Sequence, residues 1–297
     1  VKKIMKSYLV SLRFNPAHIS HLLANYKLYQ ELGYEPTLVL NNKYKNYKEL
    51  SNYSIIFFSF KILFSIPNPK NVVFWFPSIG NILLSLKFKL SKRTKLIYVF
   101  HEPFDSFVNY YKSGFKIVKI VKISLVNLIS LITTSLCNTI ILPSKKAVNL
   151  YEKNGVFFNK TYFNLPLMFD DELDINIDIP TKMYISYIGT ANSDHSFDEF
   201  INYILFAIEN NSFPDYKFLI ASKSNLNYLF ENVELKKSID NGKIVLWHNK
   251  FMTNKEINKH YLDSAIVWNA YSRTTQSGVL PKAYMFGCAV LSLEQNR

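Results

Sequence analysis

Glycine, cysteine and negative charge are scarce in this chain of 297 residues, and the first two shortages each exclude a class of protein. The eight glycines form no Gly-x-Gly-x-x-Gly run and no P-loop, so two common nucleotide-binding fingerprints are absent. No Gly-x-Ser-x-Gly elbow marks a hydrolase. The two cysteines, Cys137 and Cys288, lie far apart in apolar contexts. That spacing excludes a zinc site and predicts reduced core residues of a cytoplasmic protein.

Long apolar runs are also missing. No window holds the roughly 18 uninterrupted apolar residues of a membrane-spanning helix, so the sequence predicts no such span. The charged start, residues 1–6, is not followed by the apolar core and small-residue cleavage site of a signal peptide.

Negative charge is scarce in one half only. Residues 1–165 hold 23 Lys and Arg against 6 Asp and Glu, a balance of +17, whereas residues 166–297 hold 12 against 16, a balance of −4. Two interpretations stay open for the basic half: it meets an anionic membrane or another polyanion, or it carries a solvated lysine-rich surface. No nucleic-acid-binding module is present, so we expect no nucleic-acid partner.

The apolar runs that are present predict two α/β domains. Continuous runs without polar alternation are typical of parallel strands covered on both faces. In the first series we predict strands at 7–14, 37–40, 54–60, 72–76, 96–100 and 139–142, with helices at 17–32 and 145–153. In the second we predict strands at 184–188, 217–220, 244–246, 266–268 and 289–291, with helices at 197–209 and 254–262. We therefore expect two doubly wound, Rossmann-like domains, 1–165 and 181–297, that face a cleft and are joined by a linker at 166–180.

The segment 111–136 reads as a basic amphipathic helix. Four lysines, Lys112, Lys116, Lys119 and Lys122, fall within one arc of a helical wheel. Val118, Val121, Leu125, Leu128, Ile129 and Ile132 occupy the opposite side. One interpretation is a helix whose lysines bind an anionic membrane surface; the other is a sheet-packing helix with a solvated lysine face.

The last third of the chain contains a pattern suited to an anion. Small polar residues and a glycine, Ser277-Gly278, open a predicted helix that Gly287 closes. Unpaired backbone N–H groups at a helix start attract phosphate. Lys282 lies one turn inside that helix, which predicts a diphosphate site.

Together these patterns resemble a GT-B glycosyltransferase of the family-4-like group, similar to bacterial enzymes that build O-antigen or capsular polysaccharide. The resemblance covers nearly the whole chain. It rests on four motifs: Phe14-Asn15-Pro16-Ala17-His18, His101-Glu102-Pro103, Tyr187-Ile188-Gly189-Thr190, and Ser277-Gly278 through Gly287.

The resemblance implies a nucleotide-sugar site in the second domain. Backbone N–H groups of Gly278, Val279 and Leu280 would hold the diphosphate, with Lys282 and Arg273 as its cations. The remaining implied donor contacts are Gly189, Thr190 and Ser277 at the diphosphate, Thr275 and Gln276 at the sugar, and Trp247, His248 and Lys250 at the base. Two family features are missing: the usual glutamate pair falls on Thr275 and Lys282, and the usual Arg and Lys fall on Thr190 and His195. We therefore add Lys223 as a candidate cation.

The resemblance also implies an acceptor site in the first domain. His101 is the predicted proton acceptor or sugar-orienting group, because a His after a parallel strand and before Glu-Pro is held at the sheet edge. Glu102 and Asp105 are the alternative bases. His18 is predicted to face the acceptor, and His21, one turn later, to be structural. Domain closure would bring His101 to the donor sugar.

The function implied is transfer of a sugar from a nucleotide-diphosphate donor to a lipid-linked oligosaccharide, in surface polysaccharide synthesis. The enzyme would lie in the cytoplasm at the inner face of the cell membrane. The chain has no Asp-x-Asp motif, so we expect no metal and no cofactor, and Asp170-Asp171-Glu172 reads as solvated charge. We also expect the final helices of the fold to be missing. The alternatives are a truncated or degenerate non-catalytic protein and a GT-B-fold epimerase of nucleotide sugars.

Overall fold

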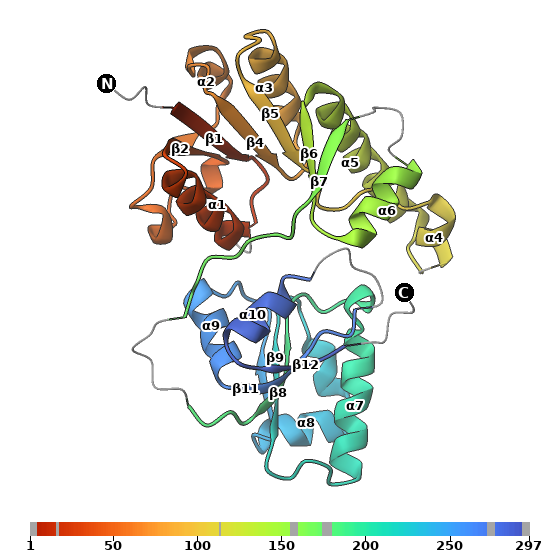
Figure 1. Ribbon diagram of the computed structural model, residues 1–297. Coiled ribbons are helices and arrows are strands. Elements are labelled where there is room, and N and C mark those ends of the chain that lie inside the picture. Colours follow the sequence, from red (N-terminus) through yellow and green to blue (C-terminus); the bar gives the residue numbers. More distant parts are fainter. Residues whose placement is uncertain are drawn as a thin grey trace. The chain divides into compact units, whose positions relative to one another are not determined.

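The computed structural model describes residues 5–15, 18–112, 114–154, 160–173, 180–271 and 277–292. The chain divides into two compact units, residues 1–170 and 171–297, which we call the first and second domains (Figure 1). The division falls inside the segment 166–180 that the sequence predicts as a linker.

The first domain is built on a seven-stranded parallel sheet. Its strand order is β3-β2-β1-β4-β5-β6-β7. The strands are β1 (Met5–Ser11), β2 (Tyr34–Leu40), β3 (Ile55–Phe57), β4 (Asn71–Trp75), β5 (Lys95–Val99), β6 (Thr139–Leu142) and β7 (Thr161–Asn164). Every residue of the central strand β4 is buried, as expected for a strand covered on both faces.

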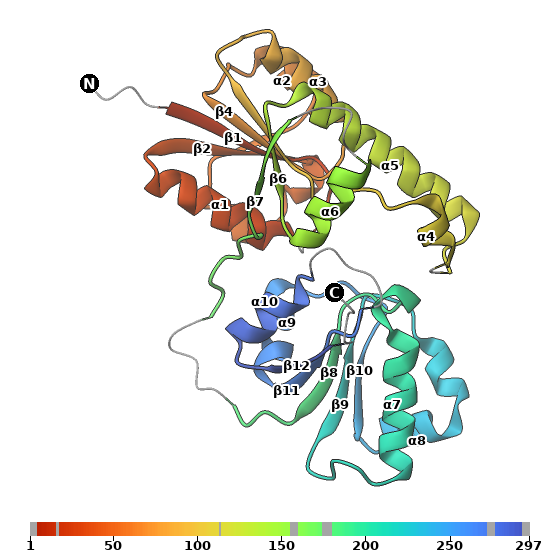
Figure 2. The ribbon, with the colours of Figure 1, turned by 45° about the vertical axis from the view of Figure 1, so that its right-hand side comes forward.

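Helices cover both faces of this sheet. The helices are α1 (Ile19–Glu31), α2 (Phe60–Ser65), α3 (Ile79–Lys89), α4 (Phe107–Lys112), α5 (Ile117–Leu136) and α6 (Lys145–Asn154). Helices α2, α3, α5 and α6 lie along one face of the sheet (Figure 2). Their apolar side chains form one core with it. Those of α1, two short 3-10 helices (Asn42–Tyr44 and Lys48–Leu50) and Leu167 form the core on the other face.

The second domain repeats this plan on five parallel strands. They are β8 (Tyr184–Ile188), β9 (Lys217–Ala221), β10 (Ile244–Trp247), β11 (Ser264–Trp268) and β12 (Ala289–Leu291), in the order β10-β9-β8-β11-β12. The helices are α7 (Phe197–Glu209), α8 (Val233–Asp240), α9 (Asn254–Leu262) and α10 (Val279–Met285), with 3-10 helices at Ser193–His195 and Asn227–Glu231. Helices α7 and α8 pack on one face, and α9 and α10 on the other.

Local sequence signals explain where several helices begin and end. The Ser144 hydroxyl accepts a hydrogen bond from the Ala147 N–H at the start of α6. Thr253 and Glu256 form a reciprocal capping box on α9. Gly33, at φ +78°, follows the C-cap of α1 in a conformation that other residues rarely adopt.

The structure corrects several predicted elements. Helices α2, α3 and α8 and strand β7 were not predicted. Helix α2 begins at Phe60, which the sequence assigns to a strand, because the Ser59 hydroxyl caps the N–H of Ile62. The predicted helix 111–136 is two helices, α4 and α5. The helix predicted at 17–32 is α1, and its N-cap is His18. Both cysteines are free and buried, as predicted.

In both sheets the direction of strand addition reverses once. The chain proceeds outward from β1 to β2 and β3, and then returns to place β4 on the other side of β1. The same reversal separates β8 from β11. The predicted fold class, two doubly wound parallel α/β domains, is therefore confirmed. Such reversal points are where open α/β sheets bind ligands, outside the carboxyl ends of the strands.

Candidate functional site

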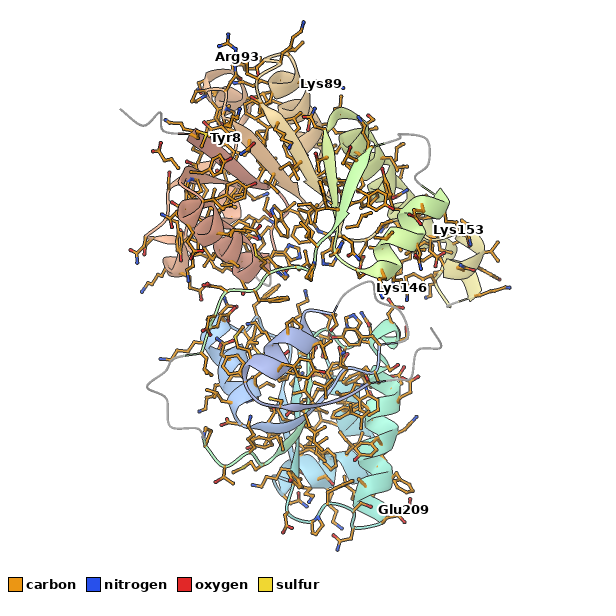
Figure 3. All side chains as sticks on the ribbon, viewed as in Figure 1. Tyr8, Lys89, Arg93, Lys146, Lys153 and Glu209 are labelled. Atoms are coloured by element: carbon orange, nitrogen blue, oxygen red, sulfur yellow. The ribbon has the colours of Figure 1, made fainter. Side chains whose placement is uncertain are left out.

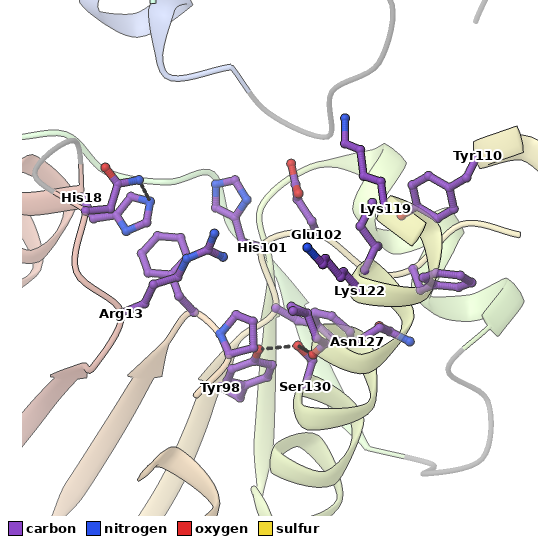
Figure 4. Close-up of a pocket in the computed structure, with 17 residues that line it drawn as sticks. Arg13, His18, Tyr98, His101, Glu102, Tyr110, Lys119, Lys122, Asn127 and Ser130 are labelled. Atoms are coloured by element: carbon purple, nitrogen blue, oxygen red, sulfur yellow. Dashed lines mark hydrogen bonds between the residues drawn. The ribbon is translucent and has the colours of Figure 1, made fainter. Parts of the chain in front are cut away.

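A pocket lies at the reversal point of the first sheet (Figure 4). Its lining includes Arg13 and Asn15 after β1, Phe76 after β4 and His101 after β5, and helix α5 forms its other wall. The cavity volume is about 390 Å³. We call this cavity the first-domain pocket; it lies where the chain topology alone would place a ligand site.

The pocket brings together the three residues predicted for the chemistry and the acceptor: His18, His101 and Glu102. Both histidine rings lie near the Phe76 ring. The centroid of Phe76 is 5.6 Å from that of His101 and 3.5 Å from that of His18, which is stacked on it. Burial lowers the pKa of His101 below its ordinary value of 6.5, and the charge of Glu102 opposes this shift in part. A neutral imidazole at the pocket wall is able to accept a proton.

Burial has a larger effect on His18. Its pKa falls from 6.5 to about 2, first through desolvation and then through repulsion by the Arg13 charge and by any proton on His101 or His21. A neutral His18 accepts a hydrogen bond from the Asn15 side-chain amide at Nε2, 2.9 Å away, which leaves the proton on Nδ1. That Nδ1 is buried and has no hydrogen-bond partner among the described residues.

Two other candidates in this region have structural roles. His21 is buried, and its Nδ1 donates to the Met168 carbonyl oxygen at 2.8 Å, as the sequence predicts for a structural histidine. The Asp105 carboxylate accepts hydrogen bonds from the Ser106 N–H and the Asn109 side chain at the start of α4. The Asp105 carboxylate therefore stabilises the start of α4, and Glu102 is the carboxylate that lines the pocket.

Two of the four lysines predicted to bind a membrane also belong to the pocket. Lys119 and Lys122 line the cavity, and both are exposed, as are Lys112 and Lys116. The Lys119 ammonium also lies 3.8 Å from the centre of the Phe115 ring. Arg13, which the sequence does not single out, supplies a third cation to the lining. Other cationic side chains project elsewhere on the first domain; Figure 3 labels Lys89, Arg93, Lys146 and Lys153.

Helix α5 does not bury the large apolar face that a soluble amphipathic helix is expected to bury. Its buried positions include Ser130, Thr133 and Thr134, and the Tyr98 hydroxyl donates to Ser130 Oγ at 3.0 Å. An apolar arc faces solvent instead: Val118, Val121, Leu125, Leu128 and Ile132. We call these five residues the α5 arc. Helix α5 therefore packs on the sheet with its lysines exposed, as one of the two interpretations predicts, but it does not pack through the apolar arc.

The prediction that no segment is suited to span a membrane also needs correction. Helix α5 is 20 residues long with a mean hydropathy of 1.8 over 18 residues, which is enough to cross a bilayer by length and composition. Lysines interrupt its apolar runs, so a search for uninterrupted runs misses it. It connects β5 to β6 and packs on α3 and β5, so in this structure it is part of the first domain.

The second domain has its own cluster at the reversal point between β8 and β11. Gly189 follows β8 at φ +154°, and a Cβ atom there would lie 3.7 Å from the Tyr271 hydroxyl oxygen, next to β11. The Thr190 carbonyl accepts hydrogen bonds from the Tyr187 hydroxyl and from His195 Nδ1. The His195 ring stacks on Tyr271 at 4.1 Å, so His195 is part of the loop's internal structure.

Several of the predicted diphosphate-binding groups around α10 already form hydrogen bonds or ion pairs within the second domain. The Val279 N–H already donates to the Ser277 hydroxyl, which in turn donates to Asn269 Oδ1. Lys282 Nζ lies 2.8 Å from Glu172 and 3.1 Å from Asn258 Oδ1, and both charged side chains are 12% exposed. Gly278 is exposed, and Leu280 lies half-buried in the first turn.

Two of the three acidic linker residues are not solvated charge. Glu172 forms the ion pair with Lys282, and Asp170, whose side chain is 15% exposed, pairs with Lys27 at 2.6 Å. The interpretation as solvated charge is therefore wrong for Asp170 and Glu172, each of which neutralises a lysine of its own domain, whereas Asp171 is exposed as expected.

The predicted base-binding residues lie at the carboxyl end of β10. Lys250 Nζ lies 3.9 Å from the centre of the Trp247 ring, and His248 Nδ1 accepts a hydrogen bond from the Leu226 N–H. Lys223, after β9, lies 5.6 Å from the Phe251 ring. Three other predicted donor contacts, Arg273, Thr275 and Gln276, lie outside the described residues.

Comparison with known proteins identifies the fold. No protein-family model and no curated protein sequence matches the chain. Among solved structures, HepE of Anabaena in complex with UDP has a TM-score of 0.65 at 10% identity, over 97% of this chain and 80% of that one. UDP-GlcNAc 2-epimerase of Methanocaldococcus jannaschii has a TM-score of 0.61 at 15% identity, over 98% and 84%.

This chain has the GT-B fold. Sucrose-phosphate synthase of Thermosynechococcus elongatus is a further match, with a TM-score of 0.60 at 10% identity over 97% of this chain and 81% of that one. At these identities the likeness concerns the arrangement of strands and helices. The GT-B part of the predicted resemblance is therefore supported, and the family-4-like assignment stays a prediction.

Proposed function

We propose that this protein is a metal-independent glycosyltransferase that moves a sugar from a nucleotide-diphosphate donor to a lipid-linked oligosaccharide. The observation that carries this proposal is the first-domain pocket, which holds His18, His101 and Glu102 at the reversal point of a GT-B sheet. In support, solved structures of the same fold include HepE bound to UDP and glucose, and a pneumococcal O-GlcNAc transferase bound to UDP and GlcNAc.

The proposed reaction divides between the two domains. The second domain holds the nucleotide-sugar, with the diphosphate near Gly189, Gly278 and Leu280. The bond between the sugar C1 and the diphosphate oxygen breaks, and the diphosphate leaves with the electron pair. An acceptor hydroxyl oxygen forms the new bond to C1, and its proton passes to neutral His101, with Glu102 beside the ring.

We further propose that the enzyme works at the inner face of the cell membrane, in surface polysaccharide synthesis such as O-antigen or capsule. The α5 arc and the exposed Phe107, Val108 and Tyr111 of α4 present apolar side chains next to exposed lysines. Apolar side chains that insert at the interface, flanked by cations that attract anionic lipid, are typical of peripheral membrane binding.

A two-stage experiment tests the function. First, UDP-, GDP-, CMP- and dTDP-sugars are compared by thermal shift; we expect at least one to raise the melting temperature. Second, sugar transfer from that donor to lipid-linked acceptor extract is measured with EDTA present. His101→Ala should reduce the rate by about 10²-fold to 10⁴-fold while the nucleotide-induced thermal shift stays, as expected for loss of a general base. If no nucleotide shifts the melting temperature, the proposal fails. Detectable transfer would exclude a non-catalytic protein.

A nucleotide-sugar epimerase is the second candidate, and one observation favours it. The sequence offers no convincing acid–base partner for His101, but the structure places His18 and Glu102 in the same pocket. UDP-GlcNAc 2-epimerases are among the structures with this fold. Incubation with UDP-GlcNAc in the absence of any acceptor separates the two candidates. NMR detection of inversion at the sugar C2 would favour the epimerase.

A further inference from the structure

A second cavity of the first domain lies beside the edge strand β3. It has a volume of about 310 Å³ and is lined by residues of β3 and of the loop with two 3-10 helices that joins β2 to β3. Its lining includes four aromatic side chains: Tyr44, Tyr47, Tyr53 and Phe57. We call this cavity the edge groove. None of its lining residues lines the first-domain pocket.

Two tyrosines offer the groove both a ring and a hydroxyl. Tyr47 and Tyr53 are half-buried, and within the described residues neither hydroxyl forms a hydrogen bond. Their rings are held in place from behind: Tyr47 packs edge-on against Phe14 and Tyr44, and Tyr53 against Tyr26. Aromatic rings that are already fixed lose little conformational freedom on binding. Such rings beside free hydroxyls suit a sugar, which has an apolar C–H face and a rim of hydroxyls.

Strand β3 adds backbone hydrogen-bonding groups. The Ser54 carbonyl and the Phe58 N–H bond to β2, so alternate residues of this strand direct their backbone groups to the sheet. Ile55 and Phe57 lie between those positions, and both line the groove. Their N–H and C=O groups therefore point to the open edge of the sheet. Sugar hydroxyls both donate and accept hydrogen bonds, so they match such mixed groups.

The edge groove is positively charged. Lys45 and Lys48 line it, both are exposed, and the described lining residues include no Asp or Glu. The Lys45 ammonium lies 5.7 Å from the centre of the Phe57 ring, which places one cation at the aromatic wall. A neutral sugar gains little from two cations, whereas a sugar that carries a carboxylate is attracted by both.

The edge groove is adjacent to the first-domain pocket through one side chain. Tyr44 lines the groove, and its hydroxyl bonds the Asn15 N–H and the Asn15 carbonyl oxygen, each at 2.8 Å. Asn15 in turn lines the first-domain pocket. One glycan chain is therefore able to occupy both cavities, with different sugars in each.

We propose that the edge groove binds an acidic sugar of the growing glycan, such as a uronic acid, at a position away from the reacting end. The inference rests on the proposed function, because it names a sugar of the acceptor and gives it a site of its own. The sugar ring lies against Tyr47 and Tyr53, and its carboxylate is bound by Lys48. The backbone groups of Ile55 and Phe57 bond the ring hydroxyls.

The experiment measures binding to the full chain by calorimetry with three probes. They are a tetrasaccharide of alternating glucuronic acid and N-acetylglucosamine, the same tetrasaccharide with its carboxyl groups reduced to alcohols, and a tetraglutamate peptide. The variants are Lys48→Gln and the double variant Tyr47→Phe with Tyr53→Phe, which keeps both rings. Lys43→Gln is the matched control, because Lys43 is an exposed lysine of the same loop that does not line the groove.

We expect Lys48→Gln to weaken binding of the acidic tetrasaccharide by about tenfold or more, and the tyrosine variant to weaken it by about fivefold or more. The reduced tetrasaccharide should bind about tenfold more weakly than the acidic one, and Lys43→Gln should change nothing. Equal losses in Lys43→Gln and Lys48→Gln would overturn the proposal, because the attraction would then be unspecific. Equal affinity for the tetraglutamate peptide would overturn it as well, in favour of an acidic protein segment.

The nucleotide thermal shift separates this inference from the proposed function. If the acidic tetrasaccharide does not bind the native chain while a nucleotide-sugar raises the melting temperature, the groove assignment fails and the transferase proposal stands. If the tetrasaccharide binds through Lys48 and the two tyrosines while no nucleotide-sugar shifts the melting temperature, the transferase proposal fails and the groove remains a site for acidic sugars.

Discussion

At the scale of single residues, burial decides the charge of the histidines in the first-domain pocket. Desolvation, and to a lesser extent the nearby Arg13 charge, lower the pKa of His18 and hold its ring neutral, and burial does the same for His101. Neutral rings at pH 7 act as hydrogen-bond partners and proton acceptors. Charged rings would add to the positive charge of Arg13 and Lys122 and lose that capacity.

The lowered pKa of His18 predicts a pH-dependent stability. Between pH 6.5 and about 2 the unfolded chain binds a proton at this histidine and the folded chain does not, so stability is lost as the pH falls below 6.5. One such group changes the free energy of unfolding by about 1.4 kcal/mol per pH unit. Urea unfolding measured from pH 7 to pH 5 gives this slope. His18→Gln should reduce the slope by up to that amount; an unchanged slope would show that His18 titrates normally.

The ion pair between Lys282 and Glu172 supports a second prediction. Both side chains are 12% exposed, so removing either one leaves a poorly solvated charge without its partner. Lys282→Met alone should lower the free energy of unfolding by about 3 kcal/mol in the absence of any nucleotide. Adding Glu172→Gln should recover much of that loss.

A double-mutant cycle on these two positions distinguishes the structural role from the phosphate role expected from the sequence. If Lys282→Met leaves stability unchanged and only weakens nucleotide binding, Lys282 is a donor ligand and the pair contributes little.

At the scale of elements, the strand pattern was predictable and several site residues were not. Strands 139–142 and 184–188 match the structure residue for residue, because strands buried on both faces have continuous apolar sequences. Strand 289–291 also has the predicted bounds, but it is an edge strand with two exposed residues rather than the buried strand expected. Arg13 is absent from the predicted site because the predicted first strand extends to Phe14, whereas β1 ends at Ser11. That error moved a residue of the sheet edge, where ligands bind, into the sheet interior. Lys122 and Tyr98 line the same pocket only because α5 packs beside β5, and no local sequence pattern predicts that packing.

Helix α5 shows why amphipathicity alone does not give orientation. Its wheel separates lysines from large apolar residues, and the usual rule turns the apolar side inward. In the structure the narrow polar stripe of Ser130, Thr133 and Thr134 packs inward, since small side chains allow α5 to lie close to α3 and the sheet. The large apolar residues are thereby left outside, and they predict a surface with a binding function.

Replacement of two residues of the α5 arc tests that surface. Val118 and Leu125 are 67% and 58% exposed, so Val118→Gln with Leu125→Gln should leave folding within about 0.5 kcal/mol of the native value. Vesicle sedimentation should fall by about tenfold or more, because each inserted side chain contributes of order 1 kcal/mol.

Val233→Gln is the matched control, since Val233 is 76% exposed on α8 of the second domain. Part of the binding should persist in high salt and on zwitterionic vesicles, because apolar insertion is not screened, while the share that needs anionic lipid falls with salt. Equal losses in the arc variant and the Val233 variant would argue against α5 as the membrane face.

At the scale of the whole molecule, two domains of the same plan carry opposite charge and different candidate ligands. The basic half contains the pocket with three lining cations, and the mildly acidic half contains the predicted donor site. Each site lies at the reversal point of its own sheet. The topology thus accounts for both positions with one rule, and the charge difference assigns a different chemistry to each.

Hydrogen exchange on the full chain tests this division of roles. A nucleotide-sugar should slow exchange in the loops that follow β8, β9 and β10, at residues 189–191, 222–224 and 247–250, because ligand binding suppresses local opening. A lipid-linked oligosaccharide acceptor should instead slow exchange at residues 98–102 and 119–127, which contribute to the lining of the first-domain pocket. Each ligand should leave the other set unchanged in rate when added alone. If the nucleotide-sugar protects residues 98–102 and leaves 189–191 unaffected, the donor belongs to the first domain, and the assignment of ligands to the two sheets must be exchanged.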